Sequence, residues 1–204
     1  MYILSIVLGY LLGSIPFALV IGKVFFNTDV RKHGSGNLGG TNTGRVLGKK
    51  AGLAVAVLDV LKVVLAIAIT SRFENANVCS SLAGCAAAIG HCYPLFARFK
   101  GGKAVATTFG YLFGISIFTF HDHFIYLLPL IIFLMVLYFT KIVSISSICF
   151  GITSSIYVLC TIDTTATIFG DELPIEQLAE QLGTITYEIL TSVSRRVQRV
   201  YYYE

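Results

Sequence analysis

Two short segments combine glycines with cationic side chains in a way that suits the binding of phosphate. The first reads HGSGNLGGTNTGR over residues 33–45, and the second reads KGGKAVATT over residues 100–108. Glycine permits positive φ and lets backbone N–H groups turn toward an anion, while a helix that starts directly afterwards adds its dipole. Neither segment matches the nucleotide-binding pattern G-x-x-x-x-G-K-[ST].

Arginine and lysine supply the charge in these segments. Arg45, Lys100 and Lys103 would hold two phosphate groups close together through charge-assisted hydrogen bonds. A single glycine-rich basic loop is more often a flexible connector between membrane spans. Two such segments on the same side of a membrane favour a binding site.

Other polar residues fall within or beside apolar segments. His91, in GHCYP, fits a hydrogen-bonded interior histidine as well as a catalytic base. Asp59 and Lys62 lie three residues apart, so we expect them to pair on one helix face, chiefly in a structural role. Ser147, in KIVSISSI, lies where serine either caps a helix or contacts a phosphate.

Apolar segments long enough to cross a membrane must position these residues. The chain of 204 residues is 55% hydrophobic and 13% charged, with a mean hydropathy of +0.79, which is not a soluble globular composition. About 20 apolar residues cross a hydrocarbon core roughly 30 Å thick. The candidate windows are Tyr2–Gly22, Ala51–Thr70, Val78–Phe96, Val105–Phe120, Phe124–Thr140 and Ile142–Ile162. The sequence therefore predicts an all-α fold, a polytopic integral membrane helix bundle of six to seven transmembrane helices.

The basic residues indicate the orientation of this bundle. Lysine and arginine gather in residues 23–50 and 98–103, whereas residues 71–77 and 121–123 carry few of them. By the positive-inside rule the N-terminus lies outside, and both glycine-rich segments lie on the cytoplasmic side. The net charge of +4 then follows from topology and implies no nucleic-acid partner. The five cysteines form no metal-type cluster, so we expect small buried side chains, no metal and no cofactor.

The sequence resembles the PlsY family of bacterial acyl-phosphate:glycerol-3-phosphate acyltransferases. The resemblance covers about residues 1–150 and rests on YLLGSIPFALVIGK, GSGNLGGTNTGRVLGKKAG, LDVLK, GHCYPLFARFKGGKAVAT and KIVSISSI. It implies a helical enzyme of the bacterial cytoplasmic (inner) membrane, with its active site on the cytoplasmic face. Members transfer a fatty acyl group from acyl phosphate to the 1-hydroxyl of sn-glycerol 3-phosphate, giving lysophosphatidic acid and phosphate in phospholipid biosynthesis. The implied partners are these two substrates, membrane lipid and, as a further candidate, the enzyme that makes acyl phosphate.

The resemblance also implies roles for individual residues, and our own analysis adds His91. The residues predicted to be catalytic are Ser35, Arg45, His91 and Lys103. The residues predicted to bind substrate are Asn37, Thr41, Asn42, Lys100, Gly101, Gly102, Thr107 and Ser147. Ala104 stands where the family usually has glycine, which would disturb the phosphate loop if a positive φ is required there.

The carboxyl end departs from the family pattern. Residues 163–204 contain neither the histidine nor the asparagine of the family's final motif, and no apolar run of 18 residues. We therefore divide the chain into a membrane-embedded acyltransferase domain, residues 1–162, and an atypical segment, residues 163–204, which forms an amphipathic helix or a poor seventh span. Two alternatives stay open: a small transporter or channel for an anionic, phosphate-bearing solute, and an inactive acyltransferase homologue.

Overall fold

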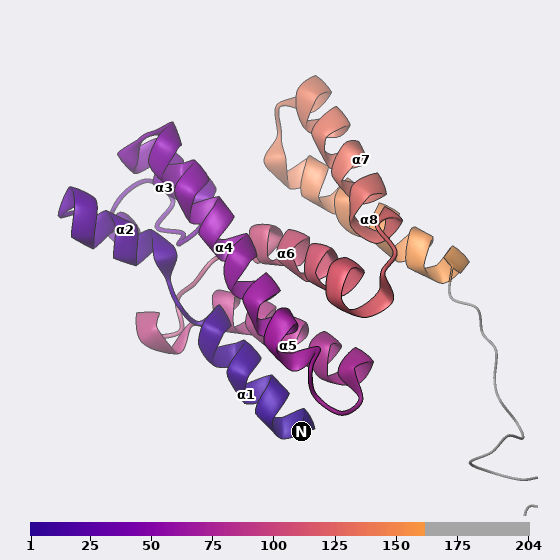
Figure 1. The fold of residues 1–204 in the computed structure, drawn as a ribbon. Helices are drawn as coiled ribbons and strands as arrows, with labels where there is room; N and C mark the ends of the chain where they lie inside the picture. Colours follow the sequence, from indigo (N-terminus) through magenta and orange to yellow (C-terminus); the bar gives the residue numbers. More distant parts are fainter. Residues whose placement is uncertain (162–204) are drawn as a thin grey trace, which may run out of the picture. The chain divides into compact units, whose positions relative to one another are not determined.

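The computed structural model describes residues 1–161, so the atypical segment predicted over residues 163–204 lies outside the described part. All regular elements in residues 1–161 are helical, which confirms the all-α part of the predicted fold class (Figure 1). The helices are α1 (Tyr2–Gly13), α2 (Phe17–Phe26), α3 (Gly40–Leu47), α4 (Lys49–Thr70), α5 (Ala76–Cys92), α6 (Val105–Ile115), α7 (Phe124–Thr140) and α8 (Val143–Thr161). The single turns are η1 (Val30–Lys32), η2 (Leu95–Ala97) and the π-helical η3 (Ser116–Phe120).

Four helical stretches of the described part are long and apolar enough to cross a membrane. They are Tyr2–Phe26, Lys49–Thr70, Ala76–Ala97 and Val143–Thr161. The remaining two predicted windows, Val105–Phe120 and Phe124–Thr140, form shorter apolar helices. Large apolar side chains point outward from these helices, and Leu65 is 51% exposed, Ile89 58% and Leu159 76%. Such an exterior suits hydrocarbon rather than water.

The first predicted span is broken into two helices at Ser14–Pro16, so α1 and α2 are separate elements. Proline lacks an N–H donor and disfavours helical backbone in the residue before it, which explains the break. The Ile15 carbonyl in this break accepts a hydrogen bond from Nζ of Lys62 on α4, at 3.0 Å. A basic side chain of α4 thus donates a hydrogen bond to a backbone carbonyl that the break leaves without a helical partner.

Small residues let the helices approach closely. A Cβ on Gly13 of α1 would overlap the carbonyl oxygen of Ala87 on α5. A Cβ on Gly40 of α3 would lie 2.6 Å from the carbonyl oxygen of Gly52 on α4. Contacts of this kind are typical of membrane helices, which associate through backbone proximity.

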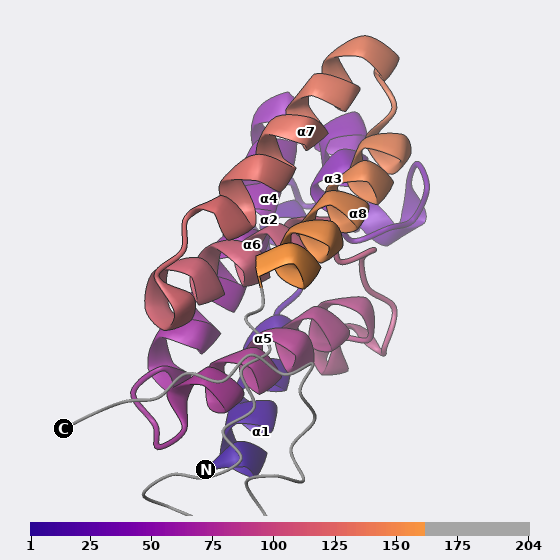
Figure 2. The ribbon, with the colours of Figure 1, turned by 90° about the vertical axis from the view of Figure 1, so that its right-hand side faces the viewer.

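Two apolar clusters fill the interior. The cluster near the glycine-rich segments consists of Ala18, Leu19, Ile21, Val30, Leu38, Ala51, Val55 and Ala97. The other cluster consists of Val63, Ile67, Ala87, Leu112, Ile115, Ile125 and Phe150, and it joins α4 and α5 to the α7–α8 pair that Figure 2 shows side by side. The first cluster matters for function, because Leu38 comes from the first glycine-rich segment and Ala97 from the turn before the second.

All five cysteines lie in the described part, and all are free. Cys79 is buried as expected, whereas Cys85 and Cys160 are exposed. The expectation of buried cysteines was therefore wrong for these two.

Candidate functional site

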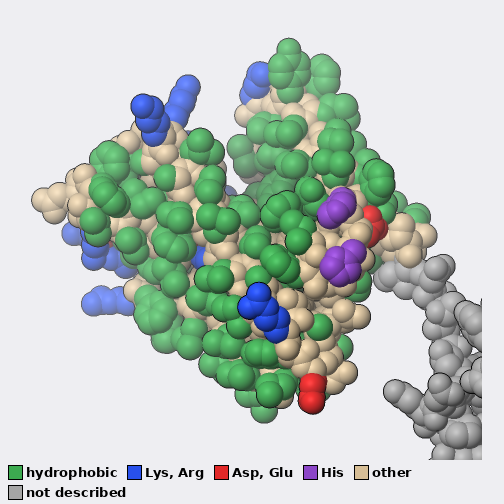
Figure 3. Space-filling view, viewed as in Figure 1, with side chains coloured by type: hydrophobic (Ala, Val, Ile, Leu, Met, Phe, Trp, Pro, Cys, Tyr) green, Lys and Arg blue, Asp and Glu red, His purple; other side chains and the backbone are tan. Residues whose placement is uncertain are grey.

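The two glycine-rich segments meet in the structure. The Leu38 N–H donates to the carbonyl of Gly101 at 3.5 Å, and Leu38 and Ala97 share one apolar cluster. The predicted proximity of the two segments is therefore confirmed. Figure 3 shows lysine and arginine side chains gathered at the end of the molecule where α2 and α3 lie, while hydrophobic side chains cover most of the remaining face.

Part of the first segment is helical rather than a loop. Thr41, Asn42 and Arg45 lie on α3, which begins at Gly40. Glycine, threonine and asparagine are poor helix formers, so the sequence favoured irregular structure here. The close packing of Gly40 against Gly52 of α4 outweighs that propensity. The helix presents Arg45 and Thr41 with exposed side chains.

Asn42 organises the loop that precedes α3. Its side chain is 2% exposed, and its Oδ1 accepts from the Ser35 N–H at 2.8 Å. Its Nδ2 donates to the carbonyls of Val30, His33 and Asn37 at 3.2, 3.3 and 3.0 Å. The whole amide group is thus engaged in hydrogen bonds within the protein. These bonds fix the position of Ser35, which is exposed, relative to α3.

The second segment is packed against the end of α5. The Gly102 N–H donates to the carbonyl of His91 at 3.0 Å. A Cβ on Gly102 would overlap Nε2 of the His91 ring, and a Cβ on Gly101 would overlap the His91 carbonyl and lie 2.7 Å from that of Cys92. These glycines are therefore required by close approach to His91.

Positive φ, which the sequence analysis attributed to these glycines, occurs at neighbouring residues instead. Arg98, Phe99 and Ala104 have φ of 57°, 58° and 58°. Ala104 thus occupies the left-handed region, so the condition stated above for strain at this residue is met.

The start of α6 offers donors for an anion. The N–H groups of Lys103 and Ala104, which directly precede α6, have no acceptor within residues 1–161, and the start of the helix beside them carries the positive end of its dipole. The side chains of Lys100 and Lys103 are exposed. Thr107 is buried, and its hydroxyl donates to the carbonyl of Ala104 at 2.8 Å, which stabilises the turn into α6.

A buried polar cluster lies behind this segment. Nζ of Lys62 is 2.8 Å from Oδ1 of Asp59 and 3.0 Å from Nδ1 of His91. The predicted pairing of Asp59 with Lys62 is confirmed, and the three residues are 1%, 4% and 5% exposed, in the order Asp59, Lys62, His91. The contact of His91 with this pair was not predicted, although two ionisable residues within a span are a signal to look for a third polar partner.

Ser147 takes no part in the contacts between the two segments described above. It lies in the first turns of α8, where its hydroxyl donates to the carbonyl of Ser144 at 2.9 Å. Among residues 1–161, no three His, Cys, Asp or Glu side chains come together in a group that would hold a metal ion.

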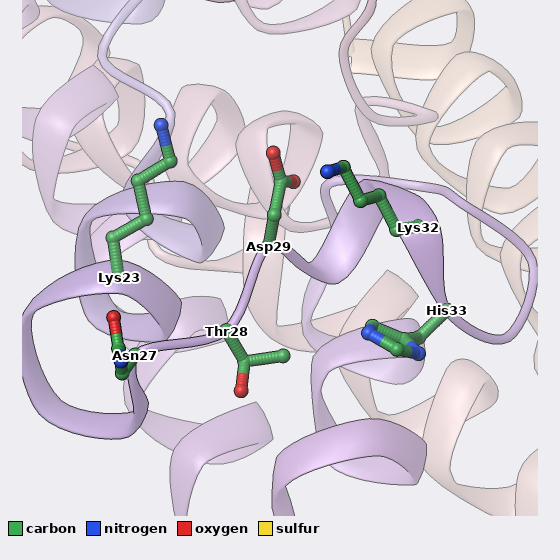
Figure 4. A pocket seen from close by; sticks show the side chains of 6 residues that line it. All are labelled: Lys23, Asn27, Thr28, Asp29, Lys32 and His33. Atoms are coloured by element: carbon green, nitrogen blue, oxygen red, sulfur yellow. The ribbon is translucent and has the colours of Figure 1, made fainter.

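A pocket of about 550 Å³ lies beside the first segment and was not predicted (Figure 4). Its lining residues are Lys23, Asn27, Thr28, Asp29, Lys32 and His33. Arg31 donates to the Asp29 carboxylate at 2.7 Å and lowers the pKa of that carboxyl to about 2. Figure 4 shows Lys23 and Lys32 on either side of Asp29. From the sequence alone, these lysines were interpreted only as indicators of membrane orientation.

Comparison with known proteins decides the family. A family model described as Glycerol-3-phosphate acyltransferase matches residues 3–193. The chain belongs to the glycerol-3-phosphate acyltransferase family. The glycerol-3-phosphate acyltransferases of Bacillus cytotoxicus and Bacillus cereus strain G9842 are 40% and 41% identical to it, over 96% and 97% of this chain and 91% and 92% of theirs. That of Macrococcus caseolyticus is 48% identical over 71% of each chain.

Two crystal structures of PlsY (YgiH), an integral membrane glycerol 3-phosphate acyltransferase, are similar to this acyltransferase. The glycerol 3-phosphate form has a TM-score of 0.70 at 35% identity and covers 79% of this chain and 78% of its own. The lysophosphatidic acid form has a TM-score of 0.67 at 34% identity and covers 79% and 77%. The predicted family and enzyme class are confirmed, and the similarity extends beyond residue 150, where the motifs ended. The chain is a membrane protein and an acyltransferase of phospholipid synthesis.

Proposed function

We propose that this acyltransferase transfers a fatty acyl group from acyl phosphate to the 1-hydroxyl of sn-glycerol 3-phosphate, giving lysophosphatidic acid and inorganic phosphate. The hydroxyl oxygen forms a bond to the acyl carbon while the bond from that carbon to the phosphate oxygen breaks. The hydroxyl proton leaves on the released phosphate. The observation that carries the proposal is the contact between Leu38 and Gly101, which joins two cationic glycine-rich segments into one site.

The phosphate of glycerol 3-phosphate is assigned to the start of α6. Support comes from the N–H groups of Lys103 and Ala104, which have no acceptor within residues 1–161, and from the exposed ammonium groups of Lys100 and Lys103. Phosphate commonly binds at such a helix start. The Gly102 N–H is already donated to His91, so Gly101 and Gly102 shape the site rather than supply all of its donors.

Acyl phosphate is assigned to the first segment. Arg45, exposed on α3, has the planar group that binds phosphate through two parallel hydrogen bonds. Ser35, held by Asn42, and the neighbouring Asn37 and Thr41 complete this half of the site. In this proposal Asn42 positions Ser35 and does not itself contact substrate, because its amide is fully engaged.

Chemistry at such a site consists mainly of positioning and charge compensation. Acyl phosphate is already activated, whereas two anions repel each other as the hydroxyl approaches the acyl carbon. Cations on both segments offset that repulsion and stabilise charge that develops on the leaving phosphate. Ser147, at the start of α8, is proposed as a further phosphate contact.

Membrane topology forms part of the proposal. We assign six spans to the described part, with α6 and η3 together and α7 added to the four long stretches. The N-terminus lies outside the bacterial cytoplasmic membrane, and the site lies on its inner face. The gathering of basic side chains near α2 and α3 supports this orientation (Figure 3). The enzyme that makes acyl phosphate is a proposed partner.

The test uses the purified full chain in detergent. Phosphate release from acyl phosphate is followed with and without glycerol 3-phosphate, and lysophosphatidic acid is detected by mass spectrometry. We expect release that depends on the acceptor, with one lysophosphatidic acid formed per phosphate. A folded sample without acceptor-dependent release would contradict the proposal and favour the transporter or the inactive homologue. Acylation from acyl-CoA but not from acyl phosphate would show that the donor is misassigned.

A further inference from the structure

Three ionisable side chains occupy the protein interior behind the second glycine-rich segment. Asp59 and Lys62 lie on α4, His91 lies at the end of α5, and none is more than 5% exposed. Ionisable groups within a membrane bundle are costly unless they are paired, and they commonly serve function. Pairing alone would need only Asp59 and Lys62, so the third member requires its own explanation.

The hydrogen bonds of Lys62 determine which nitrogen of His91 carries the proton. A lysine ammonium has three N–H donors and no acceptor. Nζ has three neighbours at hydrogen-bonding distance: Oδ1 of Asp59 at 2.8 Å, the Ile15 carbonyl at 3.0 Å and Nδ1 of His91 at 3.0 Å. Nδ1 lies farther from Oδ1 of Asp59, at 3.5 Å. An ammonium on Lys62 can only donate to Nδ1, so we assign Nδ1 as the acceptor and place the ring N–H on Nε2.

The opposite side of His91 holds the second segment. The Nε2 edge of the ring lies against Gly102, so closely that a Cβ on this glycine would overlap Nε2. The carbonyl of the same histidine accepts the Gly102 N–H at 3.0 Å. The ring and the backbone of His91 together fix the position of Gly102. A rotation of the ring would remove the contact between the ring and Gly102 and leave only the backbone hydrogen bond.

We propose that Asp59 and Lys62 are positioning residues for substrate binding: Asp59 orients Lys62, Lys62 orients the His91 ring, and the ring fixes the backbone of Gly101–Gly102. The inference rests on the proposed function, because it takes this backbone to shape the site for the phosphate of glycerol 3-phosphate. Neither Asp59 nor Lys62 contacts substrate. The competing interpretation is that the pair only stabilises the break between α1 and α2 through the Ile15 carbonyl.

The experiment uses the double variant Asp59→Leu/Lys62→Met in the full chain. Replacing both charges by apolar side chains of comparable shape avoids the unpaired buried charge that either single change would leave. His91 Nδ1 then lacks its donor. We expect the KM for glycerol 3-phosphate to rise about tenfold, as for the loss of one positioning hydrogen bond, with kcat within about twofold. Amide hydrogen exchange of residues 98–104 should become faster, while that of α1 stays unchanged.

The control is Leu65→Met, a change on the exposed face of α4 that should alter neither reading. Wild-type KM with wild-type exchange in the double variant would overturn the inference and leave the proposed function intact. Wild-type KM with faster exchange at residues 98–104 would overturn the inference and the assignment of the glycerol 3-phosphate phosphate to this segment, whereas acyl transfer to glycerol 3-phosphate itself would stand. Should the double variant not fold, His91→Gln tests the last step, from the ring to Gly102, by the same two readings, and wild-type values for both would overturn the inference.

Discussion

Substitution of Gly102 by alanine tests the site where its packing is tightest. The new methyl would overlap Nε2 of His91 and lie 2.7 and 2.8 Å from Cε1 and Cδ2 of the same ring. The ring does not move aside freely, because Nδ1 is bonded to Lys62 at 3.0 Å. The backbone of residues 101–103 must therefore shift, and the hydrogen bond from the Gly102 N–H to the His91 carbonyl must lengthen.

Overpacking of this kind costs about 1–3 kcal/mol. If that cost falls on the geometry that binds glycerol 3-phosphate, its KM rises by about 5- to 150-fold, since 1.4 kcal/mol corresponds to a factor of ten. The value of kcat should change much less, because the segment that carries Arg45 is not displaced. Initial rates of phosphate release at varied glycerol 3-phosphate, with acyl phosphate saturating, measure both constants.

Gly151→Ala is the matched control, because a Cβ on this α8 glycine meets no atom within 4 Å. Its KM and kcat should equal those of the wild type. A Gly102→Ala enzyme with wild-type KM would refute the reasoning, since it would show that the segment either tolerates the methyl or does not bind the acceptor.

Three further changes test other parts of the site. Arg45→Ala should lower the acceptor-dependent rate about 10²- to 10³-fold, the usual effect of removing a group that stabilises transition-state charge, whereas Arg72→Ala on the loop between α4 and α5 should not. Asn42→Ala should lower the free energy of unfolding by about 3 kcal/mol, because the hydrogen bonds of a buried amide are lost, which thermal unfolding in detergent measures. Ala104→Gly should raise the free energy of unfolding by about 1 kcal/mol, because φ is 58° at this residue. An unchanged or lower unfolding temperature would contradict the assigned strain.

The helices were largely predictable, because long apolar runs leave few other structures in a membrane. The helix α3 was not predictable, because the residues of Gly40–Leu47 have poor helix propensity. This helix forms through packing against Gly52. The break at Pro16 was visible in the sequence, but its consequence, a carbonyl accepting from Lys62, depends on a residue 47 positions away. Local sequence carries no information on such a contact.

The meeting of the two glycine-rich segments was predictable, whereas the contacts that hold each segment in place were not. Cationic glycine-rich segments on one side of a membrane indicated a phosphate site, and the two segments do meet. Gly101 and Gly102, however, are required by their approach to His91 rather than by positive φ, which occurs at Ala104. The role of Asn42 was also hidden, because its hydrogen bonds reach back as far as Val30.

The glycine content of the two segments suggests flexibility. Hydrogen bonds to Asn42 nevertheless hold the first segment in place, and a hydrogen bond to His91 holds the second. A flexible loop loses conformational entropy when it closes on an anion, and this loss weakens binding. Segments that the protein already holds in place before substrate arrives lose little conformational entropy on binding. In the proposed reaction, most of the attraction between the cations and the two phosphates is then available to bring the hydroxyl and the acyl carbon together.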